Sequence, residues 1–379
     1  MKEFQRPNSC ILLLTLSCNL RCKMCYLWSN NEDQKEYPSF DSLRETIDTL
    51  EVWAEKPFTI VFGGGEPLLH KEKLAALIHY AHEKGFRTSL ATSGYDLDKD
   101  TVIKLGNAGL DYAALTLYSL RSRTQDFLRG VKGTVKRVKK AIKMFRCYAP
   151  HIEIAIDTVL MAPNMKDIVP LTRWVQKNRY LSRISFQSVV QPFHTPPCES
   201  WYTDDRYSFL WPQETAAMIE VIDTLQAMKR EEEKRGITTI SNSPRQFDVF
   251  KNYFREPDTF VKHEGCPVFN NGNFGIAPDG AVTLCPYMQP IGNVKENPID
   301  RIWESPDAEQ RRDEIRRCSS NCHHIMNCWY EEESDDQSVP EHEERNNADV
   351  SCPDARIDGP AVSCQTEHST PHGERAEIT

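Results

Sequence analysis

The feature that most limits the possible folds is an alternation of two patterns between residues 9 and about 190. Short apolar runs alternate with longer stretches in which apolar residues recur at helical spacing, as in Leu43, Ile47 and Leu50. This alternation indicates repeated βα units around a parallel sheet, whose largely apolar strands are covered on both faces. We predict six strands, at residues 9–16, 58–62, 87–91, 113–117, 153–160 and 183–189. Six such units predict an α/β fold, with a partial (βα)6 barrel in residues 1–190.

The rest of the chain is organised differently. Residues 191–254 begin with an irregular segment rich in proline and continue into an amphipathic stretch at 213–235, so we expect a connection with bridging helices. Within residues 255–330, a Pro-Asp-Gly turn at 278–280 separates two short apolar runs, which predicts a β-hairpin in a small cysteine-rich α+β domain. Residues 331–379 begin with an acidic run and hold almost no large apolar side chain. Since burial cannot offset their ordering entropy, we expect a disordered acidic tail.

Composition excludes some classes of function. The 46 basic and 55 acidic residues give a formal net charge of −9, which argues against general nucleic-acid binding. No apolar run is long enough to span a membrane, and residues 1–8 do not resemble a secretory signal, so we expect a cytoplasmic protein. In a reducing compartment, 13 cysteines indicate metal ligands or reactive thiols more than disulfides.

Three cysteines stand in one loop directly after the first predicted strand: Cys18, Cys22 and Cys25. Loops at the carboxyl ends of parallel strands are where active sites collect. Three thiolates on a four-iron cluster leave one iron open to another ligand, so this spacing favours a catalytic iron–sulfur cluster. The alternatives are a structural zinc site with a fourth ligand elsewhere and unligated buried thiols.

The CxxxCxxC loop resembles the signature of radical S-adenosylmethionine (radical SAM) enzymes, and a second landmark of that family follows. At the end of the second strand, the Gly63–Pro67 segment resembles the family's GGEP element. The resemblance implies a TIM-like partial barrel and a [4Fe-4S] cluster on the three catalytic cysteines, with S-adenosylmethionine bound to its open iron. It also implies cofactor contacts from Gly64 and Gly65, and a hydrogen bond from the methionine ammonium to Glu66.

The resemblance implies further cofactor contacts at other strand ends. Ser93 stands after the third strand, where the family often has asparagine. After the fourth strand, Thr116 would meet the ribose and Arg129 the methionine carboxylate. Asn164 occupies a similar polar position after the fifth strand. The aromatic residue that usually precedes the last cysteine is replaced by Met24, and Tyr26 follows instead.

A second group of cysteines lies in the predicted α+β domain: Cys266, Cys285, Cys318, Cys322 and Cys328. Their C-x13-G-x4-C and C-x3-C-x5-C spacing resembles the SPASM or shorter twitch extension, which carries auxiliary clusters in many radical SAM enzymes. A full extension of this type has more cysteines and carries two clusters. Only five cysteines are present here, and one [4Fe-4S] cluster needs at most four, so we predict a single auxiliary cluster. Which of the five is not a ligand stays open. A structural zinc site of four thiolates is the alternative.

The resemblance implies reductive cleavage of S-adenosylmethionine to a 5′-deoxyadenosyl radical, which abstracts hydrogen from a substrate. By analogy with the family, that substrate is a peptide or protein, or a small polar molecule. A one-electron donor such as flavodoxin or ferredoxin would be the redox partner. The alternative is an iron–sulfur electron-transfer or scaffold protein without substrate chemistry.

Overall fold

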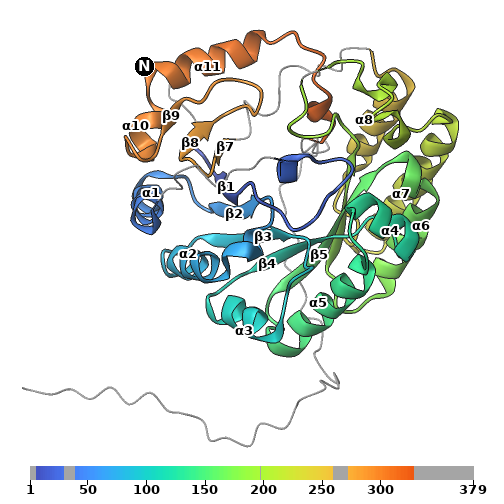
Figure 1. Ribbon diagram of the computed structural model, residues 1–379, viewed down its shortest axis with the longest axis horizontal. Helices are drawn as coiled ribbons and strands as arrows, with labels where there is room; N and C mark the ends of the chain where they lie inside the picture. Colours follow the sequence, from blue (N-terminus) through green and yellow to red (C-terminus); the bar gives the residue numbers. More distant parts are fainter. Residues whose placement is uncertain (1–5, 30–38, 197, 259–271, 328–379) are drawn as a thin grey trace, which may run out of the picture. The chain divides into compact units, whose positions relative to one another are not determined.

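The computed structural model describes residues 6–29, 39–196, 198–258 and 272–327 (Figure 1). The described strands form one sheet in the order β6-β5-β4-β3-β2-β1-β7-β8-β9. The first six strands run parallel to their neighbours. Their bounds are β1 (Ser9–Thr15), β2 (Thr59–Gly64), β3 (Arg87–Thr92), β4 (Tyr112–Thr116), β5 (Glu153–Leu160) and β6 (Arg183–Ser188). Three short strands complete the sheet: β7 (Asn273–Ile276), β8 (Ala281–Thr283) and β9 (Gly292–Asn293).

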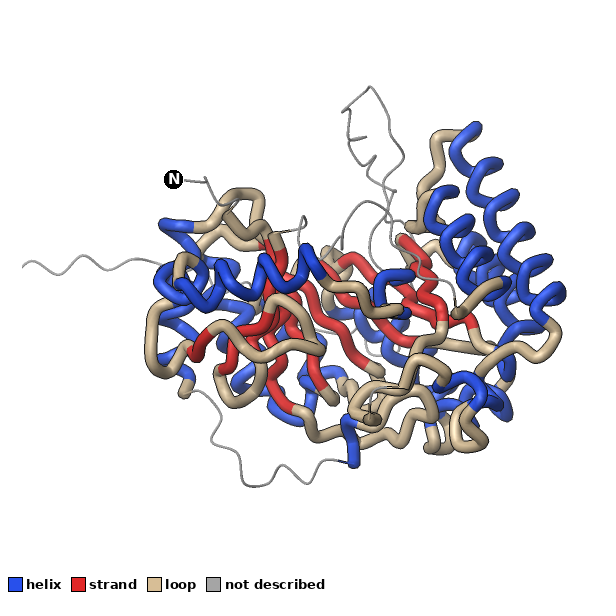
Figure 2. Tube along the Cα trace, turned by 90° about the horizontal axis from the view of Figure 1, so that it is seen from above, coloured by secondary structure: helices blue, strands red, loops and turns tan. Residues whose placement is uncertain are grey.

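Helices connect the six parallel strands and lie around them, with the strands together in red in Figure 2. Because the strands follow sequence order and such crossovers are right-handed, the helices between them fall on one side of the sheet. They are α1 (Phe40–Trp53), α2 (Lys71–Glu83), α3 (Lys99–Asn107), α4 (Ser122–Arg129), α5 (Thr134–Tyr148) and α6 (Met165–Lys177). Beyond β6 come α7 (Thr215–Lys234), α8 (Pro244–Arg255), α10 (Ile299–Trp303) and α11 (Pro306–Arg317).

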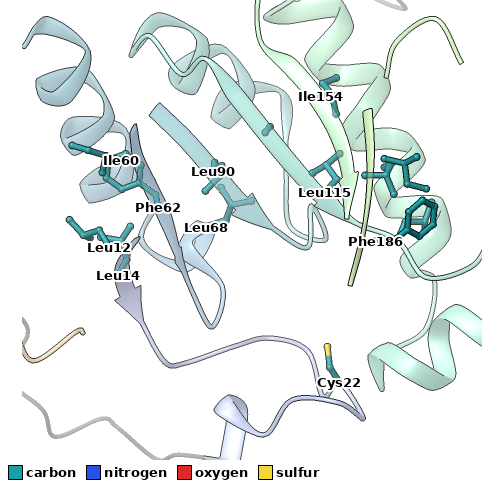
Figure 3. Packing of buried hydrophobic residues seen from close by; sticks show 14 of the residues in the cluster. Leu12, Leu14, Cys22, Ile60, Phe62, Leu68, Leu90, Leu115, Ile154 and Phe186 are labelled. Carbon is teal, nitrogen blue, oxygen red and sulfur yellow. The ribbon is translucent and has the colours of Figure 1, made fainter. Parts of the chain in front are cut away.

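The two faces of the parallel strands carry different side chains. The hydrophobic core contains alternate residues such as Ile60, Phe62, Leu115 and Ile154, several of which Figure 3 shows together. The residues between them, such as Thr116 on β4, are smaller or polar and point to the opposite side, because successive strand side chains alternate. We call this opposite side the inner face. It is the face on which a substrate can be bound without disrupting the core.

The predicted partial barrel is confirmed. All six predicted strands are present, with bounds that differ from the prediction by at most two residues, and the predicted helix at 213–235 corresponds to α7. The predicted hairpin is also present, since β7 and β8 pair antiparallel on either side of the Pro-Asp-Gly turn.

The hairpin extends the barrel sheet, which the sequence did not indicate. Strand β7 pairs in parallel with β1, with Ser9 opposite Asn273 and Leu12 opposite Ile276. The strands of the cysteine-rich segment therefore continue the sheet that carries the first cysteine loop. The boundaries at 190, 254 and 330 stay predictions, and the predicted tail, residues 331–379, lies outside the described residues.

None of the helices in the described ranges combines the length and the apolar character that crossing a bilayer requires.

Candidate active site

The predicted ligands of the first group, Cys18, Cys22 and Cys25, lie in the loop after β1. Figure 3 labels Cys22 in this loop. Cys22 is buried and the other two are half-buried. Burial raises the pKa of Cys18 to about 11 and that of Cys25 to about 12, although Arg129 lowers both. Thiolates at such positions need compensating positive charge, which bound iron supplies. Three neighbouring sulfur donors beside a buried arginine therefore fit a four-iron cluster.

Main-chain hydrogen bonds attach this loop to the end of α4. The Arg21 N–H donates to the Arg129 carbonyl at 3.0 Å, and the Lys23 N–H donates to the Leu128 carbonyl at 2.9 Å. Gly130, which ends α4 with a φ of +69°, makes this approach possible, because a Cβ there would lie 2.3 Å from the Arg21 carbonyl oxygen. The position of the loop thus depends on how α4 ends.

The glycines of the predicted GGEP element bring β2 close to the same loop. A Cβ on Gly64 would lie 2.2 Å from the Thr15 oxygen, and one on Gly65 would lie 2.1 Å from the Ser17 oxygen. The N–H of Gly65 donates to Thr15 O at 2.7 Å. In the structure these glycines serve main-chain packing against the start of the cysteine loop. Their contact with the cofactor stays a prediction.

Glu66 is buried and connects the ends of β2 and β3. Its Oε1 accepts hydrogen bonds from Thr92 Oγ1 at 2.6 Å and from Leu68 N at 3.2 Å. Its Oε2 accepts from the N–H of Ser93 at 2.9 Å and also from the Ser93 hydroxyl. Ser93, predicted at the cofactor site, is therefore brought to Glu66. The carboxylate holds the turn after β3 in place beside the cysteine loop.

Arg129 is 6% exposed and lies close to the cysteines. Its Nη1 donates to the hydroxyl of Tyr118 at 3.2 Å, and its guanidinium carbon lies 5.3 Å from the centre of the Tyr118 ring. A buried guanidinium beside neutral thiols is costly unless an anion accompanies it. The predicted methionine carboxylate, or the thiolates themselves, would meet that need.

Thr116 lies on the inner face at the end of β4, paired in register with Asp157 of β5. Asn164 is brought near the end of the same strands but is fully buried. Its Oδ1 accepts from the Met161 N–H at 3.0 Å, and its Nδ2 donates to the carbonyls of Tyr118 and Val159. These bonds give Asn164 a structural role, and its contact with the cofactor stays a prediction.

Tyr26 extends the cysteine loop toward the segment after β6. Its N–H donates to the Phe193 carbonyl at 3.0 Å, and its ring stacks on Trp28 with centroids 5.5 Å apart. The ring thus belongs to an aromatic cluster at the edge of the site.

In the second cysteine group the structure describes Cys285, Cys318 and Cys322, all half-buried, while Cys266 and Cys328 lie outside the described residues. Among the described residues, no three His, Cys, Asp or Glu side chains are arranged to hold one metal ion. In a four-iron cluster each thiolate binds a different iron, so its ligands are spaced more widely than those of a single ion.

A cavity of about 290 Å³ lies between the two cysteine groups. Its lining includes Met24 from the first loop together with Cys285 and Cys322 from the second group. Most of the remaining lining is apolar, from Val159, Val189, Val190 and Phe193, with Gln187 and His324 among the polar residues. The described lining contains no Lys, Arg, Asp or Glu. A compact uncharged group could therefore be held here, between the two predicted clusters.

Aromatic rings connect the two groups along this cavity. Phe193, which bridges to Cys25 through the main chain, lies 5.0 Å from the ring of His324, and His324 lies 5.0 Å from Tyr287. Burial, with the nearby His323, lowers the pKa of His324 to about 4, so its ring is neutral at pH 7.

Sequence reasoning missed Asp157 and most of the cavity residues, although it had identified Cys285 and Cys322 as candidate ligands. The side chain of Asp157 lies on the inner face beside Thr116, two residues before the cavity residue Val159 on the same strand. A signal was present, since Asp157 is the one charged residue in the run from Ile154 to Leu160, which is otherwise apolar except for Thr158. Phe193 and His324 gave no such signal, because only the folding of distant segments brings them together.

Comparisons with known proteins agree with this geometry. The family model described as the Radical SAM superfamily matches residues 12–174, and the model described as SPASM, an iron-sulfur cluster-binding domain, matches residues 266–329.

Two relatives from Methanosarcina barkeri match over most of the chain. The Fe-coproporphyrin III synthase is 25% identical over 302 residues, which cover 76% of this chain and 72% of the relative. The AdoMet-dependent heme synthase is 23% identical over 318 residues, which cover 82% and 85%.

Solved structures share the fold. anSMEcpe with bound AdoMet and Cp18Cys peptide has a TM-score of 0.60 at 16% identity, covering 82% of this chain and 83% of that one. Streptococcus suis SuiB bound to S-adenosylmethionine has a TM-score of 0.62 at 16% identity, covering 81% and 68%.

Proposed function

This chain is a radical SAM enzyme with a SPASM iron–sulfur domain, and we propose that it oxidises a group that its substrate projects into the cavity between the two cysteine groups. The enzyme uses a [4Fe-4S] cluster, S-adenosylmethionine and auxiliary iron–sulfur chemistry, as its two domains imply. We assign the first cluster to Cys18, Cys22 and Cys25, and the auxiliary cluster to cysteines of the second group. The membership in an enzyme family, with relatives named as synthases, favours this over an electron-transfer or scaffold protein.

The observation that carries the proposal is the shared lining of the cavity. Met24 stands between Cys22 and Cys25 in the loop, and Cys285 and Cys322 face the same space. Whole small-molecule ligands usually occupy about 300–1,000 Å³. A cavity of about 290 Å³ lies at the lower end of this range, so it suits a side chain or another small group of a substrate.

When bound, the cluster and S-adenosylmethionine supply the 5′-deoxyadenosyl radical, which abstracts hydrogen from the substrate. The chain's own residues orient and protect that chemistry. Arg129 would hold the methionine carboxylate and Glu66 the ammonium, while Thr116 on the inner face would meet the ribose. The apolar walls from Val189, Val190 and Phe193 exclude water from the reacting group.

The charge of the cavity favours an uncharged group from a peptide, a protein or a small polar molecule. No cation in the described lining would compensate a carboxylate, and burying an unpaired charge is costly. Gln187 at the end of β6 offers an amide that could hydrogen-bond such a group.

A tetrapyrrole is a second candidate substrate. It is supported by the two Methanosarcina barkeri relatives, a Fe-coproporphyrin III synthase and a heme synthase, each of which aligns with this chain over more than two thirds of its own length. This candidate and the first differ in the charge that enters the cavity, so they can be separated experimentally.

The test uses the reconstituted enzyme with S-adenosylmethionine, dithionite and side-chain-deuterated probes. One set is a panel of peptides with deuterated serine or cysteine, and the other is iron coproporphyrin III deuterated in its propionates. Mass spectrometry of 5′-deoxyadenosine shows which probe donates deuterium. We expect transfer from an uncharged side chain and none with Cys22→Ala. Transfer from the tetrapyrrole alone would replace the first candidate by the second.

A further inference from the structure

The acidic chain contains one strongly basic segment. Residues 121–146, which include α4 and most of α5, hold ten Lys or Arg and a single acidic residue, Asp126. This segment has a formal charge of +9, which leaves −18 on the rest of the chain. The net charge of −9 therefore conceals a separation of charge into two parts of the sequence.

Most of these basic side chains are exposed to solvent. The exposed members are Arg121, Arg123, Lys132, Lys136, Arg137, Lys139, Lys140 and Lys143. Among the described residues, no acidic side chain forms an ion pair with Arg123 or Lys136, while Asp126 lies close enough to Lys132 to interact with its charge. Like charges on adjacent helical turns repel one another, so this arrangement does not stabilise the fold. We therefore infer that it serves the binding of an anionic partner.

The basic segment lies directly behind the first cysteine loop. The carbonyls of Leu128 and Arg129 accept the main-chain hydrogen bonds of Lys23 and Arg21, so the last turn of α4 touches the loop that carries Cys22. In Figure 1 the dark-blue loop after β1 reaches toward α4. A helix is about 10 Å across, so a partner on the outer side of α4 would be within roughly that distance of the loop.

An exposed aromatic pair marks the part of this surface next to the loop. Phe127 is 48% exposed and packs edge to face on Phe209, which is 40% exposed, with ring centroids 6.0 Å apart. The Nζ of Lys23 lies 5.7 Å from the Phe127 ring. An apolar centre surrounded by charge is the usual anatomy of a specific protein interface.

We propose that the basic face of α4 and the start of α5, together with Phe127 and Phe209 next to the cysteine loop, is the docking surface for an acidic one-electron carrier protein. The proposal rests on the proposed function, because it names the partner that reduces the cluster held by Cys18, Cys22 and Cys25. The carrier loses one electron and the cluster gains one, and no bond is formed or broken. Complementary charge would speed this encounter and make it sensitive to salt.

The test compares two double charge reversals. Arg123→Glu with Lys136→Glu changes the proposed surface. Arg230→Glu with Arg235→Glu is the matched control, since both residues are exposed near the end of α7, which packs on α6 and α8. Binding of flavodoxin, used as the acidic probe, is measured by titration calorimetry on cluster-free and cluster-loaded protein at about 50 and 500 mM salt. 5′-Deoxyadenosine formation is then measured with reduced flavodoxin and with dithionite.

We expect the first variant to bind flavodoxin at least about 10-fold more weakly at low salt, with a smaller difference at high salt. Its flavodoxin-driven cleavage should fall similarly, while its dithionite-driven cleavage stays within about twofold of the unchanged protein. Equal losses in the control variant, or no loss of binding in either variant, would overturn the proposal.

Other outcomes are equally decisive. Tighter binding of a DNA duplex or of phosphatidylserine vesicles than of flavodoxin, lost on the same reversal, would assign the surface to that partner instead. Absence of dithionite-driven cleavage in the unchanged protein would contradict the proposed function, yet the binding measurement on cluster-free protein would still decide whether an acidic carrier docks here.

Discussion

Asp157 is a buried carboxyl group whose surroundings disfavour its charged form. Its carboxyl lies on the inner face, paired in register with Thr116 and Ser185 on the neighbouring strands. Burial raises its pKa to about 6, although Arg183 lowers it. Tyr112 lies nearby, and Glu153 forms an ion pair with Arg183 at 3.0 Å. Asp157 lies two residues before the cavity residue Val159 on the same face of β5, and burying its charged form costs stability.

The loss of stability caused by burying Asp157 grows as the pH rises. The folded pKa lies above the unfolded value of about 4, so the folded state binds the proton more tightly. The contribution of Asp157 to the free energy of unfolding is therefore greatest below about pH 4. It decreases as the pH rises toward 6 and stays low at higher pH.

We predict that Asp157→Asn stabilises the protein by up to about 3 kcal/mol at pH 8 and has almost no effect at pH 4, because asparagine never carries the charge. Urea unfolding of both proteins from pH 4 to 8 measures the difference. A difference that does not change with pH would contradict the assignment of a raised pKa to Asp157.

At the scale of residues, sequence reasoning identified the groups that belong to short motifs. Cys18, Cys22, Cys25 and Glu66 lie together at the strand ends as their order implied, and Ser93 meets Glu66. Their roles as ligands stay predictions. Gln187, Phe193 and His324 could not be found, because a residue that lines a cavity through tertiary packing leaves no local pattern.

At the scale of elements, the end of α4 positions the cysteine loop. Gly130 and Gly133 offer a matched pair, because both have positive φ, +69° and +80°. A Cβ at Gly130 would meet the Arg21 main chain at 2.3 Å, whereas at Gly133 it would meet nothing within 4 Å.

We predict that Gly133→Ala costs about 1 kcal/mol from backbone strain alone, and that Gly130→Ala costs several times more and displaces the loop. Unfolding measures the first effect, and iron content after reconstitution measures the second. Equal iron content in the two variants would show that the contact with Arg21 does not position the ligands.

The strands were predictable because their periodicity is local, and so was the hairpin, because its turn residues are local too. The parallel pairing of β7 with β1 was not predictable. It joins residues about 260 positions apart, and four-residue strands such as Asn273–Ile276 do not specify a partner by pattern. This pairing brings the second cysteine group to the sheet of the first.

At the scale of the whole molecule, the two cysteine groups should be separable in function. We predict that Cys322→Ala lowers the iron content by about four per chain and still cleaves S-adenosylmethionine, since the first loop is intact. Cys198→Ala is the control, because that cysteine is exposed and outside both groups. Loss of cleavage in Cys322→Ala with full iron in the first site would mean that the groups form one functional unit.

The most direct measurement is iron and sulfide counting on the anaerobically reconstituted protein, followed by assay of 5′-deoxyadenosine after dithionite reduction. The central claim is a catalytic cluster on the first cysteine loop and one auxiliary cluster on the second group. It predicts about eight irons per chain with 5′-deoxyadenosine formed, and about four irons with none formed in Cys22→Ala. A fully loaded protein that forms no 5′-deoxyadenosine would contradict it.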